Sequence, residues 1–355
     1  MADWLSSMKR TYEYYVVDPG TWKNVKKLNN VKSCSITRDS EVETLGSATI
    51  DVTDSLDECY IRVYLVTDQN GVIERHPLGT FLVQTPSYSF DGKIRTVTMD
   101  AYTPLLELKE NQPPLGYSLL EGENIMERAY VLCREHARAP TVETVCDEKL
   151  NYDFVANTDD TWISFISDLI ASAKYSFELD EMGRILFSPR QELDALHPVW
   201  TFDDSNSSIL YPNVTMDRDL YGIPNVVEVI YSVGRDSFYA RVVNDDPSSP
   251  VSTVRRGREI VHRVVNPSAM GNATEEMIED HARQLLRELS TIECAISYSH
   301  GYCPVRVGDC VRINYTRAGI SNIKARVISQ TIKCDEAAEV SEKAVFTTNL
   351  WKGDA

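Results

Sequence analysis

The sequence predicts a mainly β protein that is interrupted by an α+β insertion. Short runs of alternating apolar and polar residues fill residues 11–102, a helical stripe and a hairpin pattern lie within 159–189, and β patterning returns after residue 200. With 355 residues the chain is too long for one typical core, so we expect two to four compact units. The predicted domains are a first β-barrel domain (1–110), an α+β insertion (111–200), a second β-rich domain (201–346) with a helix-containing subdomain at about 265–300, and a C-terminal tail (347–355).

The first domain has six candidate strands separated by turn residues. Asp18-Pro19-Gly20 and the segment 68–71, DQNG, break the pattern, because Gly and Asn tolerate a positive φ and Pro fixes its own φ. Six short strands close a small barrel more readily than they leave the edges of an open sheet exposed. The predicted strands are Tyr12–Val17, Val31–Arg38, Ser47–Val52, Tyr60–Thr67, Thr80–Pro86 and Ile94–Ala101.

The insertion is predicted to contain two helices and a hairpin. The first helix spans residues 123–136, and its apolar face is formed by Ile125, Met126, Ala129, Tyr130 and Cys133. The second begins near Asp159 or Asp160, either of which can cap it. The hairpin follows directly, with Phe177 in its first strand and Gly183 in its turn. The predicted core of the insertion is Trp162, Phe165, Ile166, Leu169, Ile170, Phe177 and Gly183.

The second β-rich domain is predicted from a hairpin, a helix and a strand pair. The apolar run 225–233 and the segment 238–244 alternate across the turn 234–237. Residues 305–315 and 325–334 form the strand pair that closes the fold. The helix spans 274–289 with Thr274 as its cap. Its predicted inner face consists of Met277, Ile278, His281, Leu285, Leu286 and Leu289.

Charge and hydropathy exclude several classes of protein. The formal net charge is −17 and the pI is about 4.8, which disfavours a surface that wraps nucleic acid. No run approaches the ~20 apolar residues that a membrane span needs, and residues 1–10 lack the apolar core of a signal peptide. We therefore expect no membrane-spanning segment and a protein made in a cytoplasm.

No catalytic, cofactor-binding or metal-binding residue can be assigned from sequence motifs. The phosphate loops, the nucleophile elbow and the zinc-protease motif are all missing from the sequence. The eight cysteines form no CxxC pair, and the nearest approach to a metal cluster is His300, Cys303 and Cys310, for which buried thiols are the favoured interpretation. A glycosidase-type carboxylate pair needs no sequence signature, so a hydrolase stays open as an alternative. A binding or assembly protein, with no cofactor and no enzymatic activity, is the preferred interpretation.

Four segments in a fixed order carry a resemblance to a known family. They are LGTFLVQTPSYSFDGKIRTVTMDAYTPLLELKENQ (Leu78–Gln112), DTWISFISDLIASAKYSFELDEMGRILFSP (Asp160–Pro189), DRDLYGIPNVVEVIY (Asp217–Tyr231) and VRVGDCVRINY (Val305–Tyr315). With this order the chain resembles the baseplate or tail hub proteins of bacteriophages, including those of prophages. The resemblance implies two small β-barrel domains with smaller α+β domains, and three copies that form a ring.

The resemblance also implies a function and a set of partners. The expected protein is a structural virion protein of the tail, assembled in the bacterial host cytoplasm, that joins the tail tube to the tip or spike. Its expected partners are two further copies of itself, the tail tube protein or distal tail ring, the spike or tip protein and the tape-measure protein, with viral DNA only in transit. Subunit contacts are predicted at β-domain edges, where Tyr211, Tyr221 and Ile223 lie. The alternatives are a tail-associated peptidoglycan hydrolase and a distal adaptor ring that carries receptor-binding proteins.

Overall fold

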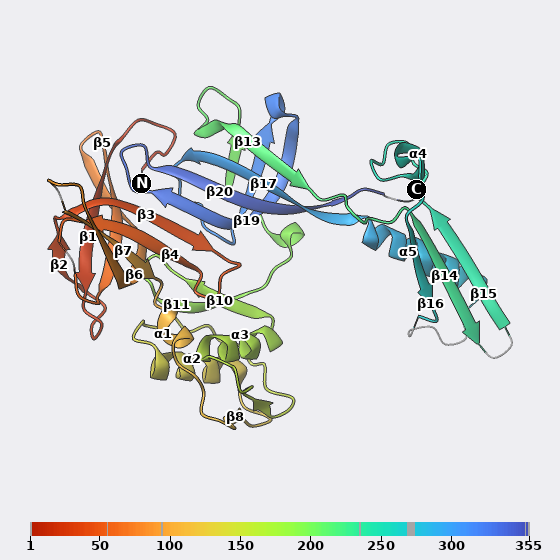
Figure 1. Cartoon of the computed structure of the whole chain (residues 1–355), viewed down its shortest axis with the longest axis horizontal. Coiled ribbons are helices and arrows are strands. Elements are labelled where there is room, and N and C mark those ends of the chain that lie inside the picture. Colours follow the sequence, from red (N-terminus) through yellow and green to blue (C-terminus); the bar gives the residue numbers. More distant parts are fainter. Residues whose placement is uncertain are drawn as a thin grey trace. The chain divides into compact units, whose positions relative to one another are not determined.

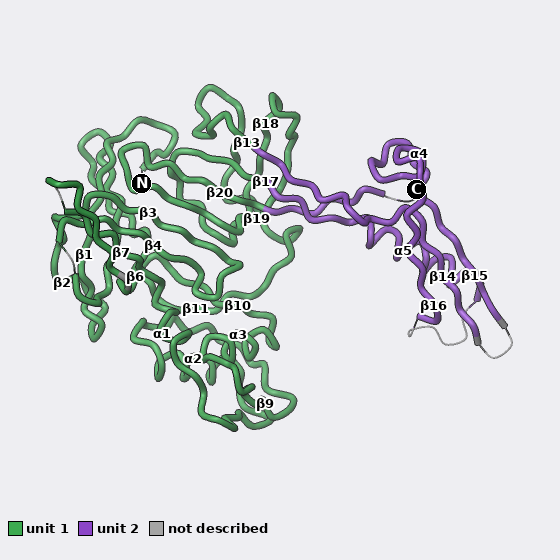
Figure 2. Tube along the Cα trace, in the orientation of Figure 1, with its two compact units in different colours: residues 1–214, 297–344 green, residues 215–296, 345–355 purple. Residues whose placement is uncertain are grey.

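The computed structural model describes residues 2–54, 56–93, 95–233, 236–267, 274–351 and 353. Strands are the commonest elements of the described residues, which confirms the mainly β class (Figure 1). The chain forms two compact units (Figure 2). Unit 1 comprises residues 1–214 and 297–344, and unit 2 comprises residues 215–296 and 345–355. The finer division into domains that the sequence suggests stays a prediction.

The front half of unit 1 contains all six predicted strands and one that was not predicted. The missed strand is β2, Asn24–Leu28. Its sequence, NVKKL, does not alternate apolar and polar residues, and only Leu28 is buried. Strand β6 is longer than predicted and runs from Val72 to Phe90; residue 94, the predicted start of the last strand, lies outside the described residues. The strands are β1 (Lys9–Val17), β2, β3 (Val31–Asp39), β4 (Gly46–Val52), β5 (Tyr60–Gln69), β6 and β7 (Arg95–Tyr102).

The expected closure of these strands into a barrel is not found among the described residues. The strand order is β13-β17-β20-β19-β3-β4-β7-β6-β5-β1-β2, so the front strands continue through β3 into the back half of the chain. Strand β3 pairs with β19 (Ile320–Lys333), from Ser329 opposite Asp39 to Lys333 opposite Ser35. This pairing satisfies the edge of β3 that barrel closure would otherwise have to cover. We call residues 34–39 and 329–334 the seam.

The insertion packs two helices against a hairpin, as predicted (Figure 1). The predicted inner face of α2, from Ile125 to Cys133, is fully buried. The cap of α3 differs from the prediction. Thr161, and neither aspartate, caps the helix in a reciprocal pair with Ser164, while Asp160 accepts a hydrogen bond from the Asn157 N–H at 2.7 Å. The elements are α1 (Leu106–Lys109), β8 (Ser118–Leu119), α2 (Ile125–His136), β9 (Phe154–Val155), α3 (Trp162–Ser172), β10 (Tyr175–Leu179), β11 (Ile185–Pro189) and η1 (Leu193–Ala195).

The back half of unit 1 is built on the predicted strand pair, β18 and β19. They are antiparallel, with Cys310 opposite Arg326, and β18 also pairs in parallel with β12. Strands β13, β17 and β20 continue from unit 1 into unit 2. The elements are β12 (Trp200–Asp203), β13 (Leu210–Arg218), β17 (Thr291–Gly301), β18 (Cys310–Tyr315), η2 (Thr316–Ala318), β19 and β20 (Glu339–Asn349).

Unit 2 packs one helix against a three-stranded sheet of order β15-β14-β16. Thr274 caps α5 as predicted, by accepting from the Met277 N–H. Met277, predicted on the inner face, is instead 48% exposed, and Trp351, predicted in a tail, is buried in the core of this unit. The predicted hairpin is present, although residues 234–235 of its turn lie outside the described residues. The elements are β14 (Val226–Val233), β15 (Asp236–Val243), α4 (Thr253–Arg256), β16 (Val261–Val265) and α5 (Glu275–Leu289).

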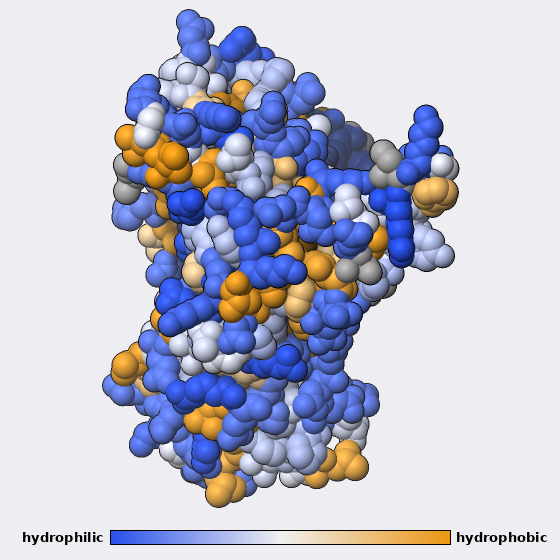
Figure 3. Space-filling model, turned by 90° about the vertical axis from the view of Figure 1, so that its left-hand side faces the viewer, coloured by the Kyte–Doolittle hydropathy of each residue, from blue (hydrophilic) through white to orange (hydrophobic). Residues whose placement is uncertain are grey.

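The surface is consistent with the high charge of the sequence. On the face that Figure 3 presents, hydrophilic side chains predominate, and apolar side chains form small groups between them.

In the part of the chain that the structure describes, none of the helices combines the length and the apolar character that spanning a membrane requires.

Acid is expected to weaken the front sheet through Glu13 on β1. Hydrogen bonds from Arg75 and then Lys27 lower the pKa of Glu13 from 4.5 to about 2. A carboxyl whose pKa is lower in the folded state contributes stability above its unfolded pKa and loses it as the pH falls through the folded pKa. The stability difference between the wild type and Glu13→Gln should therefore shrink between pH 4.5 and 2. Urea denaturation at several pH values measures this difference.

The control for this measurement is Glu41→Gln, at an exposed position. The Glu13→Gln difference should depend on pH more strongly than the Glu41→Gln difference. A Glu13→Gln difference that grew on acidification would contradict the assigned ion pairs.

Candidate functional site

The turn of the β10–β11 hairpin, residues 180–183, lies where the three parts of unit 1 meet. We call it the hairpin tip. Asp180 holds its shape, since one carboxylate oxygen accepts from the N–H groups of Met182 and Arg184 at 3.0 and 2.8 Å. The other carboxylate oxygen accepts from Arg184 Nε at 2.5 Å. An aspartate that bonds to backbone groups two and four residues ahead favours a turn over continued strand.

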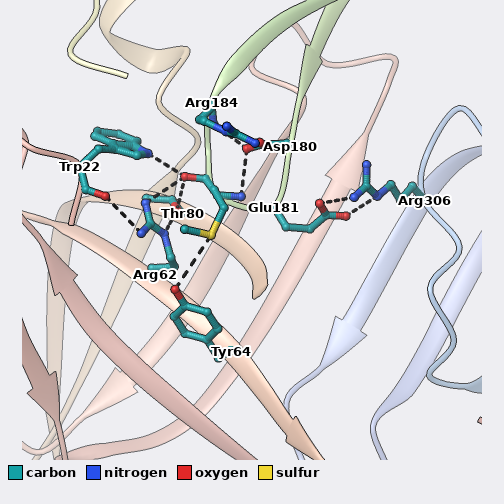
Figure 4. A network of polar contacts seen from close by, with 9 residues as sticks. Trp22, Arg62, Tyr64, Thr80, Asp180, Glu181, Arg184 and Arg306 are labelled. Atoms are coloured by element: carbon teal, nitrogen blue, oxygen red, sulfur yellow. Dashed lines mark hydrogen bonds and ion pairs between the residues drawn. The ribbon is translucent and has the colours of Figure 1, made fainter. Parts of the chain in front are cut away.

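The backbone carbonyl of Met182 accepts three hydrogen bonds from the front sheet (Figure 4). The donors are Trp22 Nε1 at 2.7 Å, Arg62 Nη2 at 3.0 Å and Thr80 Oγ1 at 3.0 Å. They come from the β1–β2 connection, from β5 and from β6. One main-chain oxygen of the insertion is therefore fixed by three separate segments of the front half.

Arg62 is the central side chain of this contact. It is 1% exposed and is among the largest fully buried side chains of the described residues. Besides Met182, its guanidinium donates to Thr80 Oγ1 at 2.8 Å, to Asn24 Oδ1 at 3.1 Å and to the Trp22 carbonyl at 3.3 Å. Every one of these acceptors is neutral, so the cation is stabilised by oriented dipoles. These four hydrogen bonds offset part of the cost of removing the charge from water.

Arg62 was not predicted from the sequence as a functional or structural site. One signal was present, because a single arginine interrupts the apolar run YIRVYLV at Tyr60–Val66. Its neighbours Ile61 and Val63 are also fully buried, so this part of β5 is covered on both faces. A charged residue inside a strand buried on both faces must find partners, and these come from segments remote in sequence.

The hairpin tip also contacts the back half of unit 1. Glu181 forms an ion pair with Arg306, in the segment before β18 (Figure 4). The Arg306 N–H donates to Asp309 Oδ2 at 2.8 Å. The tip therefore bonds to the front half of unit 1 through Met182 and to the back half through Glu181.

Gly183 completes the tip, and alanine there is expected to cost about 2–4 kcal/mol of stability. Its φ is +73°, and an added Cβ would lie 2.6 Å from Thr80 Cβ. Both the strained backbone and the displaced Thr80 contribute. Gly222→Ala is a matched control, because its φ is +71° and an added Cβ meets no atom within 4 Å. Thermal melting should show the larger loss for Gly183→Ala, and equal losses would mean that the contact with Thr80 is unimportant.

A groove of about 360 Å³ lies beside the tip, between β3, the hairpin and the segment 306–309. Its lining includes Glu178, Glu181 and Asp309. Glu178 accepts from the Ser188 hydroxyl, and Glu181 is paired with Arg306. Burial raises the pKa of Asp309, and the nearby charge of Glu178 contributes in the same direction. The groove thus contains one carboxyl with a raised pKa near a second carboxylate.

The three residues considered for a metal site are not brought together as a ligand set. His300 Nδ1 lies 3.8 Å from Cys303 Sγ and 2.7 Å from the Gly301 carbonyl, whereas Cys310 Sγ contacts the Val311 carbonyl. Burial raises the pKa of Cys303, which disfavours the thiolate that metals bind. Among the described residues, no group of three or more His, Cys, Asp or Glu side chains is placed to hold a metal ion.

A second buried polar network crosses the seam. Arg38 on β3 donates to Gln330 Oε1 at 2.9 Å, and Gln330 donates to Glu342 Oε1 at 2.7 Å. The other oxygen of Glu342 accepts from the Tyr298 hydroxyl at 2.5 Å, and His300 Nε2 lies 3.3 Å from the same carboxylate. Charge-assisted hydrogen bonds of this kind are short and strongly directional. They fix β3 against β19 and β20.

The remaining predicted residues are found in two settings. In the core of the insertion, five of the predicted residues are each at most 2% exposed, and Phe177 is partly buried against them. The five are Trp162, Phe165, Ile166, Leu169 and Ile170.

At the predicted subunit interface, Tyr211 lies on β13 and is partly buried, Tyr221 is 94% exposed, and Ile223 is only 7% exposed. Ile223 therefore offers little surface to a partner. The interface itself stays a prediction.

The whole chain is similar to two solved tail proteins. A tail protein from Neisseria meningitidis MC58 matches with a TM-score of 0.61 and 12% identity, over 95% of this chain and 97% of that one. The 43 kDa tail protein of prophage MuSo2 from Shewanella oneidensis matches with a TM-score of 0.60 and 10% identity, over 94% and 98% of the two chains. The chain has the fold of these tail proteins. No family model matches the sequence, and no curated protein does.

The tail-protein fold agrees with the resemblance noted in the sequence. The likeness covers nearly the full length of all three chains. Because the identities are so low, the likeness is one of fold.

Proposed function

We propose that this protein is a structural component of a phage tail, a homotrimeric hub that joins the tail tube to the tail tip or spike. The observation that carries the proposal is the full-length match to two tail proteins, which leaves no large part of any of the chains unaccounted for. The number of copies, the position in the tail and the partners rest on the sequence resemblance to tail hubs.

The buried networks support a structural role. Arg62 and the Met182 carbonyl join the insertion to the front sheet, and Arg38, Gln330 and Glu342 join the front sheet to the back. Buried polar groups that bond to one another across the parts favour one arrangement of those parts over alternatives. A subunit that transmits force between tube and tip requires such fixed geometry.

The charge supports a position on a channel wall. With a net charge of −17 the protein repels phosphates at short range, so DNA can pass without binding. At physiological salt this repulsion acts over roughly 8 Å. We expect no measurable retention of double-stranded DNA by the purified protein at that salt concentration.

Subunit contacts are proposed at the two ends of the large sheet. These ends are β2 and β13, and Tyr211 lies on β13. A closed ring of copies must cover or pair such edges. The fully exposed Tyr221 follows β13 in the chain and is available to a neighbouring copy.

Mass measurement in solution tests the proposal. The wild type should form trimers, alone at high concentration or together with tube protein. Tyr221→Asp should weaken assembly at least tenfold without unfolding the subunit, because its ring is 94% exposed. Tyr152→Asp, at an 81% exposed tyrosine of the insertion, is the matched control and should assemble normally. A wild type that stayed monomeric under both conditions would overturn the hub proposal.

A cell-wall hydrolase is the second candidate. The observation that favours it is the groove that contains Asp309, with its raised pKa, near Glu178. Under the hub proposal the purified protein should not clear a peptidoglycan suspension. Clearance by the wild type that Asp309→Asn abolished would instead establish the hydrolase.

A further inference from the structure

Two cysteines from opposite halves of unit 1 face each other at the end of the seam. The β3–β19 ladder pairs Ile332 with Ile36 and Lys333 with Ser35. One step further, the backbone N–H of Cys334 donates to the Cys34 carbonyl at 2.9 Å. Cys34 and Cys334 are therefore directly opposite each other on antiparallel chains.

The spacing of such a pair suits a disulfide. Residues opposite each other at a hydrogen-bonded position have Cα atoms about 5.5 Å apart. Disulfides span Cα distances of about 4.4–6.8 Å. The two side chains already interact. A hydrogen bond between them is the first cause of the raised pKa of Cys334. Both cysteines are reduced in the structure.

A crosslink between Cys34 and Cys334 would lie where the front and back halves of unit 1 are joined. Within the described residues, β3–β19 is the strand pairing that connects β1–β7 to the back half of the sheet. The cysteines extend that ladder by one residue pair. A bond between them would join the two halves of unit 1 covalently at their shared strands.

We propose that Cys34 and Cys334 are a disulfide-forming pair, which stays reduced in the cytoplasm and crosslinks the seam when the protein meets an oxidising environment. The oxidant is a small-molecule disulfide of the glutathione class. The chemistry of the pair does not depend on the proposed tail function. For a virion component, crosslinking would follow release from the cell.

The reaction balances as two thiol–disulfide exchanges. Cys334 is partly exposed and Cys34 is 6% exposed, so the Cys334 thiolate attacks first. It forms a mixed disulfide and releases one glutathione thiolate, which takes up the proton that Cys334 lost. The Cys34 thiolate then attacks Cys334 Sγ and releases the second glutathione in the same way. One oxidised glutathione is reduced to two thiols, and the protein loses two hydrogen atoms.

The raised pKa of Cys334 keeps this reaction slow at neutral pH. The hydrogen bond to Cys34, followed by burial, favours the neutral thiol over the attacking thiolate. We therefore expect the rate of crosslinking to increase with pH.

The experiment uses the full-length protein in two arms. In one, the folded protein is incubated with oxidised glutathione; in the other, it is refolded in a buffer of reduced and oxidised glutathione. The denatured product is then assayed for free thiols and mapped by mass spectrometry of its peptides. We expect the eight thiols of the chain to fall to six, and the Cys34 and Cys334 peptides to be linked. The crosslinked protein should melt roughly 5 °C higher or more, because the bond closes a very long loop.

Serine variants assign the bond. Cys334→Ser and Cys34→Ser should each abolish the linked peptide, whereas Cys59→Ser, at a partly buried cysteine outside the seam, should retain it. If Cys34→Ser fails to fold, Cys334→Ser and the peptide map of the wild type still decide the result. Eight free thiols in both arms, or linkage through other cysteines, would overturn the proposal.

Discussion

Replacing Trp162 with alanine is expected to lower the free energy of unfolding by about 3–5 kcal/mol. The indole is 2% exposed and lies at the start of α3, in the core of the insertion. It stacks on His136 with ring centroids 4.1 Å apart and meets Tyr117 edge to face at 5.0 Å. Alanine removes these contacts and leaves a cavity that the helices around it can fill only in part. Urea denaturation followed by circular dichroism measures the loss.

A matched control for this substitution is Tyr152→Ala. It removes an aromatic ring from the same insertion, but that ring is 81% exposed. Its effect should stay within about 0.5 kcal/mol. If Trp162→Ala were as mild as this control, the packing of the indole would contribute little to the stability of the insertion.

The second large effect is expected at Arg62, where methionine should cost about 3–5 kcal/mol. Methionine retains much of the volume but removes all the donors of the guanidinium. Thr80, Asn24 and the Trp22 carbonyl each lose a bond in a buried setting. Met182 keeps its bonds from Trp22 and Thr80, so the hairpin tip should loosen without leaving the sheet. Hydrogen exchange at residues 182–184, together with urea denaturation, should report both changes.

Two further variants separate the causes at this position. Arg75→Met removes an arginine whose side chain is 56% exposed, and should cost much less than Arg62→Met. Arg62→Lys keeps the charge but loses the planar fork, so its cost should lie between those of Arg62→Met and Arg75→Met. An Arg62→Met protein as stable as the wild type would show that the buried guanidinium does not contribute to the free energy of unfolding.

Sequence periodicity predicted the local elements well. The apolar faces of α2 and α3 are buried as expected, because a 3.6-residue repeat specifies which side of a helix must leave water. Errors occurred at the ends of elements and at weak patterns. The cap of α3 is Thr161 rather than an aspartate, and β2 has only one buried residue to indicate a strand.

Pairings between distant segments could not be predicted in the same way. The hydrogen bond between Arg38 and Gln330 joins residues 292 positions apart, and Cys34 and Cys334 face each other over a similar separation. Neither position has an unusual local sequence. The expected barrel closure was not found, because β3 pairs with β19 instead. Strand patterns in the sequence do not reveal which strands pair.

The amino-acid sequence by itself determined the mainly β class, the α+β insertion, the buried stripe of α3 and the turn at Gly183. Each follows from side-chain periodicity or turn chemistry within a few residues of chain. The tertiary structure was needed to show that the turn at Gly183 contacts side chains of the front strands, that Arg62 binds this turn, and that the sheet continues through the seam. Burial of polar groups requires partners from anywhere in the chain, and a local sequence pattern does not encode which segment supplies them.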